Sequence, residues 1–156
     1  MSGLAVPLIA RTLQTTGDIL LRAELDFLLR DRSGNWQPLT FRVDSGTEMT
    51  SIPADVAKLL DLPFPQQPMS GLTHGPTGQQ VRAGVIRAQV VGMDGTEYIF
   101  PCYFLGDPDA PPDPNRALTL SVSLLGLTGV VDKIRITLDG TPTPGTPNGN
   151  LVVEKL

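Results

Sequence analysis

The sequence predicts an all-β protein, and three observations point to that class. Short runs in which apolar and polar residues alternate recur along the 156 residues, as expected for strands that bury one face. The 16 glycines and 15 prolines are spread along the whole length, which indicates frequent turns. Helical spacing is confined to one or two short segments. With 40% hydrophobic residues the chain can form a core, and we expect a single domain over residues 1–156.

The first long alternating run covers residues 19–29, where every odd position is apolar. This pattern predicts a half-buried strand. Turn-forming residues follow at 31–35, and the next run places apolar side chains inward over residues 39–43 before it stops at Asp44. The two runs predict a hairpin whose second strand leads directly into Asp44.

A short helix is predicted over residues 52–60. Pro53 suits the first helical position, and an apolar stripe follows it, formed by Val56, Leu59 and Leu60. Prolines within residues 63–68 prevent the helix from continuing and keep the following segment extended.

The second half of the chain predicts further hairpins. Residues 70–84 combine glycines with polar side chains and contain little that packs in a core, so we expect an exposed, mobile hairpin there. Two apolar runs, 85–91 and 97–104, are separated by Asp94-Gly95, a pair that favours a tight turn.

An acidic, proline-rich loop is predicted over residues 106–115. The strictly alternating residues 118–124 then predict a strand, and two later apolar runs, at 134–138 and 151–153, predict two more.

Composition argues against several functional classes. The formal net charge is −4 and the 12 basic residues are scattered, which disfavours binding to nucleic acid. Cys102 is the only cysteine and His74 the only histidine, so we expect no disulfide within the chain, no metal and no cofactor, and Cys102 to be a small buried hydrophobic residue. No apolar stretch approaches 18 residues, and the first residues lack a basic segment, so we expect no membrane partner and a cytoplasmic location by default.

The segment Phe41-Arg42-Val43-Asp44-Ser45-Gly46-Thr47 resembles the active-site signature of aspartic proteases, an apolar strand followed by Asp-Thr/Ser-Gly. Leu124-Leu125-Gly126 resembles the hydrophobic-hydrophobic-Gly motif that these folds place behind the catalytic loop. The glycine-rich hairpin between the two motifs stands where a substrate-covering flap belongs. The order of elements over residues 19–138 thereby resembles the retropepsin-like family.

The resemblance implies a closed-barrel-like acid protease fold with one lobe per chain, a flap hairpin and one or two short helices. It implies that Asp44 is the catalytic carboxylate and that Ser45, Gly46 and Thr47 support the active-site loop. The flap would consist of Leu72, Thr73, His74, Gly75, Pro76, Thr77 and Gly78. The motif behind the active site would consist of Leu124, Leu125 and Gly126.

The chemistry of this family requires two carboxylates that share one water molecule. At about 3 Å apart they cannot both ionise, so one polarises the scissile carbonyl while the other takes a proton from water. This chain has one such motif, and a two-fold homodimer would bring two copies of Asp44 together. The resemblance therefore implies an aspartic endopeptidase with a polypeptide substrate, active as a homodimer, whose terminal residues 4–9 and 151–153 help to hold the dimer.

Departures from the family pattern keep two alternatives open. Asp-Ser-Gly replaces the commoner Asp-Thr-Gly, and Glu48 follows Thr47 where many members have Ala and a nearby second Asp. Leu127 and Thr128 follow Gly126 where many retropepsins have Arg and then Asp or Asn. One alternative is a catalytically inactive retropepsin-fold dimer that binds peptides or acts as a scaffold. The other is an unrelated β-barrel binding protein, since Asp-Ser-Gly is also common in ordinary turns.

Overall fold

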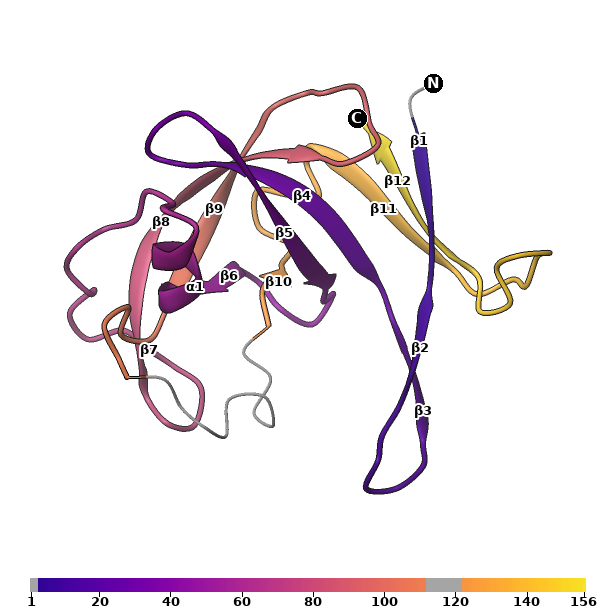
Figure 1. The fold of residues 1–156 in the computed structure, drawn as a ribbon, viewed down its shortest axis with the longest axis horizontal. Coiled ribbons are helices and arrows are strands. Elements are labelled where there is room, and N and C mark those ends of the chain that lie inside the picture. The colour runs from indigo at the N-terminus through magenta and orange to yellow at the C-terminus, as the bar shows by residue number, and fades with distance from the viewer. Residues whose placement is uncertain (1–2, 112–121) are drawn as a thin grey trace.

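The computed structural model describes residues 3–111 and 122–156, and its regular structure is almost entirely β (Figure 1). The strands of the first half are β1 (Gly3–Pro7), β2 (Ile9–Thr12), β3 (Ile19–Arg22), β4 (Glu24–Arg30), β5 (Trp36–Val43) and β6 (Thr50–Pro53). Those of the second half are β7 (Thr73–His74), β8 (Gln79–Val90), β9 (Tyr98–Leu105), β10 (Leu124–Leu125), β11 (Ile134–Asp139) and β12 (Asn150–Lys155). The predicted all-β class is confirmed. Part of the strand predicted at 118–124, residues 118–121, lies outside the described residues.

A closed barrel forms the centre of the molecule. One sheet has the strand order β4-β5-β10-β6-β9-β8-β7, and β4 also pairs with β8, so the sheet closes on itself and β7 extends one strand as a hairpin. The barrel is filled by fully buried aromatic side chains, among which Phe27 packs edge-on against Phe41 with ring centroids 5.3 Å apart. Cys102 is also fully buried, as predicted, and burial raises the pKa of its thiol.

The predicted hairpin of β4 and β5 is confirmed, and Asp31 holds its turn. Oδ1 of Asp31 accepts hydrogen bonds from the backbone N–H groups of Ser33 (2.9 Å) and Asn35 (2.8 Å), and Oδ2 accepts one from Nε2 of Gln37 (2.9 Å). These bonds, the one from Gln37 above all, lower the pKa of Asp31. The buried carboxylate therefore fixes the register that carries β5 towards Asp44.

The predicted hairpin of β8 and β9 is also confirmed, with Ala88 opposite Tyr98 and Gly95 at a positive φ of 81° in the connection. The helix α1 (Ala54–Leu59) is shorter than predicted. Pro53 is its N-terminal cap and not its first helical residue.

The predicted apolar stripe of the helix is wrong in one position. Leu59 is 84% exposed, whereas Val56 and Leu60 are half-buried. The fully buried helix residues are Ala54 and Ala57, because small side chains let this short helix lie close to the barrel.

The run at residues 19–29 is not one half-buried strand. Its second half is strand β4 with Leu25, Phe27 and Leu29 buried, as predicted. Its first half is β3, where Ile19 is 70% and Leu21 is 55% exposed, so the prediction of burial is wrong there. Among the described strands, β3 pairs with β2 alone, and the two form an arm that projects from the barrel (Figure 1).

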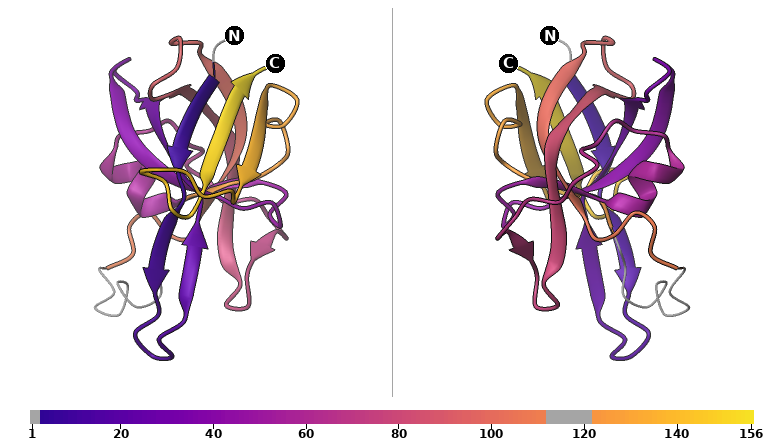
Figure 2. Two further views of the ribbon diagram at one scale, coloured as in Figure 1. Left: turned by 90° about the vertical axis from the view of Figure 1, so that its right-hand side faces the viewer. Right: turned by 90° about the vertical axis from the view of Figure 1, so that its left-hand side faces the viewer.

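The chain ends form a separate three-stranded sheet in the order β1-β12-β11, whose strands lie side by side in Figure 2. Its inward side chains, among them Leu151 and Val153, are fully buried against the core. Strand β1 thus pairs with β12 of its own chain, with Gly3 opposite Glu154 and Pro7 opposite Asn150, and β12 pairs with β11 on its other side. The outer edges of β1 and β11 have no strand partner among the described residues.

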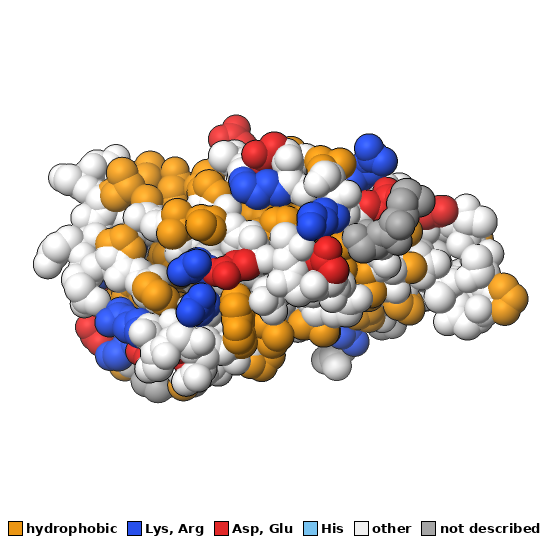
Figure 3. Space-filling model, turned by 90° about the horizontal axis from the view of Figure 1, so that it is seen from above, with side chains coloured by type: hydrophobic (Ala, Val, Ile, Leu, Met, Phe, Trp, Pro, Cys, Tyr) orange, Lys and Arg blue, Asp and Glu red, His pale blue; other side chains and the backbone are white. Residues whose placement is uncertain are grey.

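Charged side chains of opposite sign lie close together over the surface. Ion pairs join Arg87 to Glu97 (2.6 Å) and Lys155 to Asp94 (3.5 Å), and Figure 3 shows basic and acidic groups interspersed on one face. Within the described ranges, no helix has the length and hydropathy needed to cross a membrane.

Candidate active site

Asp44 stands directly after the last residue of β5, at the start of a loop that ends where β6 begins at Thr50. Its carboxylate is half-buried and bonded within the loop. Oδ1 accepts a hydrogen bond from the backbone N–H of Gly46 (2.9 Å), and Oδ2 accepts one from the hydroxyl of Thr47 (2.8 Å). A Cβ at position 46 would lie 3.3 Å from Oδ1, so glycine permits this close approach.

Strand β10 braces the loop from behind. It lies between the two strands that the loop connects, parallel to β5 with Leu125 opposite Val43, and antiparallel to β6 with Leu124 opposite Ser51. The N–H of Asp44 bonds the carbonyl oxygen of Leu125 at 3.1 Å, which ties the candidate residue itself to β10.

Gly126 passes against the loop backbone with no room for a side chain. A Cβ there would lie 2.5 Å from the carbonyl carbon of Met49 and 2.7 Å from the nitrogen of Thr50. The N–H of Gly126 donates to the buried Thr50 hydroxyl at 3.1 Å. Because the loop and this segment touch backbone to backbone, a shift of one moves the other.

The brace continues through the two residues after Gly126. The N–H of Leu127 lies within hydrogen-bond distance of the carbonyl oxygens of Thr47 (3.1 Å) and Glu48 (3.0 Å). The N–H of Thr128 donates to the carbonyl oxygen of Glu48 at 2.8 Å. These contacts use backbone atoms only. The positions at which many retropepsins carry Arg and Asp or Asn thus still hold the loop in this chain.

The predicted support residues differ in what they contact. Thr47 bonds the Asp44 carboxylate, as described, and Glu48 is exposed. Ser45 is exposed, and its hydroxyl makes no hydrogen bond within the described part of the chain. Asp44 likewise shares no hydrogen bond with a second carboxyl group among the described residues. The support roles of Ser45, Gly46 and Thr47 in catalysis stay predictions.

The predicted flap forms a hairpin at the tip of β8. Thr73 pairs with Gln80 and His74 with Gln79, and the turn between them uses positive φ angles at Gly75 (72°) and Gly78 (66°). Leu72 is half-buried, whereas Thr73, His74, Gly75, Pro76, Thr77 and Gly78 are exposed. In both Figure 1 and Figure 2 this hairpin and the β2–β3 arm project from the same end of the molecule.

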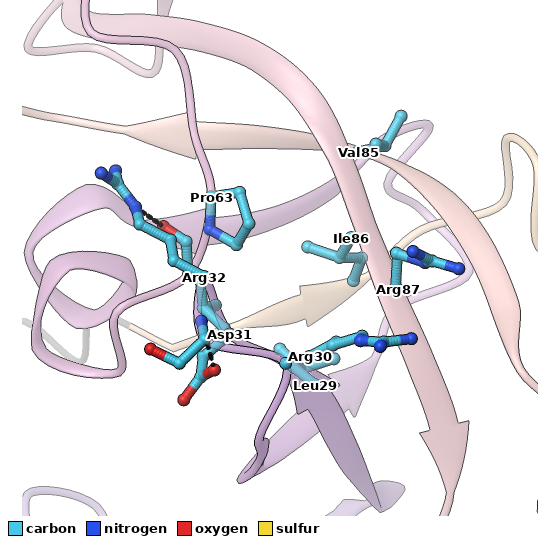
Figure 4. Close-up of a pocket in the computed structure, with 11 residues that line it drawn as sticks. Leu29, Arg30, Asp31, Arg32, Pro63, Val85, Ile86 and Arg87 are labelled. Atoms are coloured by element: carbon cyan, nitrogen blue, oxygen red, sulfur yellow. Dashed lines mark hydrogen bonds between the residues drawn. The ribbon is translucent and has the colours of Figure 1, made fainter.

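Two hollows bear on the location of a site. The larger, about 500 Å³, lies beside the last paired residues of β4 and β8, and Figure 4 shows Arg30 and Arg87 close together, with Arg32 and Pro63 on the other side of the view. Its arginines are engaged, since Arg30 and Arg87 both approach Glu97 (3.9 and 2.6 Å), and Arg32 approaches Asp61 (3.8 Å).

The larger hollow is not the candidate active site, because it adjoins the turn before β5 whereas Asp44 follows the end of β5, eight residues and about 26 Å further along. The smaller hollow, about 280 Å³, is lined by Arg42, two residues before Asp44.

Sequence reasoning missed two polar groups near Asp44. One is the Thr50 hydroxyl, which gave no signal because its partner Gly126 is distant in the chain. The other is Arg42, whose Nε atom is buried and has no hydrogen-bond partner among the described residues. A charged residue in the strand that leads to Asp44 was the available signal.

Comparison with known proteins finds similarity to solved structures. No protein-family model and no curated protein sequence matches the chain. A retropepsin-like aspartic protease from Rickettsia conorii is similar in structure, with a TM-score of 0.45 and 13% sequence identity over 85% of this chain and 92% of that chain. At this level the similarity assigns no residue and no activity to the chain.

Proposed function

We propose that the chain is an aspartic endopeptidase in which Asp44 is the catalytic carboxylate. The observation that carries the proposal is the placement of Asp44 on a loop clamped between β5 and β6 by β10. Both carboxylate oxygens are held by loop donors, and the residue remains half-exposed. A rigid, partly open carboxylate is what the activation of a water molecule requires.

The reaction needs a second carboxylate, and we propose that it comes from Asp44 of a second copy of the chain. Two copies about a two-fold axis would form a pair that holds one proton, with one member protonated and the other taking a proton from water. Two surfaces support this dimer. The edges of β1 and β11 have no strand partner among the described residues, and the arm exposes Ile19 and Leu21.

The proposed substrate is an extended polypeptide that lies between the loop at Asp44 and the hairpin at residues 72–78. Backbone hydrogen bonds to a strand edge would give affinity, and pockets for alternate side chains would give selectivity. The polar surface of the hairpin supports this role. Thr73, His74 and Thr77 are exposed and polar, so the hairpin can stay in solvent when no substrate is bound.

The test is digestion of a complex peptide mixture from about pH 3 to 8, the range in which a coupled carboxylate pair changes its protonation. New termini are identified by mass spectrometry for wild type, Asp44→Asn and the surface control Asp132→Asn, whose carboxylate lies 3.5 Å from Lys133. We expect cleavage by wild type and the control, and a loss of at least about 1,000-fold in Asp44→Asn. Activity that survives in Asp44→Asn contradicts the proposal.

The same assay at serial dilution tests the dimer, since activity per chain falls once the copies separate. Specific activity that stays constant while sedimentation shows only monomer contradicts a shared active site. Absence of cleavage by a demonstrated dimer favours the second candidate, an inactive peptide-binding module.

A further inference from the structure

Arg42 lies in β5, two residues before Asp44, which directly follows that strand. Side chains two residues apart on a strand project to the same side and are separated by about 7 Å. The ladder to the neighbouring segment continues through both residues, because the N–H of Arg42 bonds the carbonyl of Ser123 (2.9 Å) and the N–H of Asp44 bonds that of Leu125 (3.1 Å). Arg42 is therefore close to Asp44 along the strand, although the hollow that Arg42 lines has no residue of the Asp44 loop in its lining.

The guanidinium group of Arg42 differs from those of most arginines in having no carboxylate partner among residues 3–111 and 122–156. Five arginines have a carboxylate oxygen within 4.0 Å, namely Arg11, Arg30, Arg32, Arg87 and Arg135. Arg42 has none among the described residues, and its Nε atom is inaccessible to solvent and unbonded. A buried donor without an acceptor is destabilising, so this position calls for a reason beyond the stability of the fold.

The hollow around Arg42 has both apolar and polar residues in its lining. Its volume of about 280 Å³ is several times the ~30 Å³ that one water molecule occupies in the liquid. Apolar walls come from Leu39, Val56 and Val122, and polar atoms from Thr40 and Ser123. The Thr40 hydroxyl already donates to Asp26 at 2.6 Å, and Arg42 is the positively charged residue among the described residues of the lining.

Glu24 is the other charged residue that lines the hollow in the described part of the chain, and it stands directly opposite Arg42 in the β4–β5 ladder. Its carboxylate oxygen lies 4.0 Å from Arg11 of β2, and not within that distance of Arg42. Among the described residues, Glu24 thus has a contact with the arm and none within 4.0 Å of Arg42. A rotation of Glu24 towards Arg42 would compete with any anionic ligand.

We propose that Arg42 is a specificity-determining residue that selects substrates with an aspartate or glutamate side chain close to the cleaved bond. The inference rests on the proposed endopeptidase function and adds the class of side chain that the site accepts. The planar guanidinium donates two parallel hydrogen bonds to a carboxylate, and the apolar walls pack against the methylene groups of that side chain. A glutamine or asparagine side chain has the same shape but only one oxygen acceptor, so it leaves a guanidinium N–H without an acceptor. This loss is the basis on which the site would discriminate against amides.

The test uses pairs of peptides that differ by one Glu→Gln change, placed in turn at each position within three residues of a mapped cleavage site. We expect one position at which wild type cleaves the Glu peptide about 10- to 100-fold faster, measured as kcat/KM. In Arg42→Met this ratio falls to near one, and in Arg42→Lys part of it remains, because the charge is kept and the fork is lost. Glu24→Gln raises the ratio by removing the competing carboxylate.

Two results overturn the inference: a ratio within twofold at every position in wild type, or a ratio that persists in Arg42→Met. The first depends on no variant, so a folding defect in Arg42→Met does not decide the question. Should wild type cleave nothing, the proposed function fails and no cleavage site is mapped. Fluorescence anisotropy with labelled extended peptides, in pairs that differ by one Glu→Gln change at each position in turn, then judges Arg42 separately. Tighter binding of a Glu peptide that is lost in Arg42→Met supports the inference, and equal binding of all pairs refutes it.

Discussion

Strands β3 and β4 follow each other with only Ala23 between them, yet they have opposite surroundings. Strand β4 pairs with β5 on one side and with β8 on the other, and its Phe27 and Leu29 are fully buried. Among the described strands, β3 pairs with β2 alone, and its Ile19 is 70% exposed. Both strands belong to the same alternating run, so they differ in the neighbours that cover them and not in their residue types. The arm is the less stable of the two, because an isolated two-stranded ribbon is only marginally stable in water.

The largest expected effect comes from removing a side chain on the covered side of this comparison. Phe27→Ala should lower the free energy of unfolding by about 3–5 kcal/mol, because it leaves a cavity among buried aromatic rings. Ile19→Ala, at an equivalent position of the same alternating run, should change it by no more than about 0.5 kcal/mol.

Urea titrations followed by the fluorescence of Trp36 measure both variants, at several protein concentrations since dimerisation adds to apparent stability. An Ile19→Ala variant as destabilised as Phe27→Ala at the lowest concentration would show that the arm packs on its own barrel.

A smaller effect on the free energy of unfolding is expected behind Asp44, where the backbone of Gly126 touches the backbone of the loop. Gly126→Ala should cost about 2–3 kcal/mol, since the new methyl group would lie 2.5 Å from the carbonyl carbon of Met49. Gly140→Ala is the matched control, because a Cβ there meets nothing within 4 Å. Thermal unfolding of the two variants measures this difference in stability. Equal stability of Gly126→Ala and Gly140→Ala would contradict the prediction.

The smallest effect on stability is expected in the turns of the β4–β5 hairpin and of the β2–β3 arm. The lowered pKa of Asp31 means that its contribution to stability is fully present above the unfolded value, about 3.9, and is lost as the pH falls through the lower folded pKa. The stability difference between wild type and Asp31→Asn should therefore shrink between about pH 5 and pH 2.

Asp18→Asn in the turn of the arm is the control for this measurement. Its exposed carboxylate accepts a side-chain hydrogen bond from Thr16 (2.8 Å), so the substitution should change stability at neutral pH less than Asp31→Asn does. A pH-independent difference between wild type and Asp31→Asn would contradict the assignment of the turn to the ionised carboxylate.

The parts of the fold that could be predicted from the sequence depend on local pattern. Alternation gave the inward faces of β4 and β5, and Asp94-Gly95 marked the connection of β8 and β9. Alternation says which side chains share a face but not whether a neighbour covers that face, so the exposure of Ile19 was not predictable. The exposed Leu59 has a similar cause, because the small Ala54 and Ala57 provide the buried face of α1.

The candidate site could be predicted only where its residues are contiguous. Asp44 with its loop donors and Leu124-Leu125-Gly126 were both recognisable as short motifs. The bond from Gly126 to Thr50 and the burial of Arg42 Nε without a hydrogen-bond partner among the described residues depend on which strands become neighbours, which no local pattern shows. The second carboxylate, the dimer, the flap role of residues 72–78 and the cytoplasmic location stay predictions.

The insertion of β10 between β5 and β6 has a consequence for the order of folding. The strands that flank the loop of Asp44 are close in the chain, but the two-residue strand that joins them comes from far downstream. Contacts between distant segments form slowly, because closing the long loop between them costs entropy before the new contacts stabilise the chain. The loop of Asp44 should therefore gain its final geometry late, after the local hairpins have formed, so that an emerging or partly folded chain does not yet present the carboxylate in its finished setting.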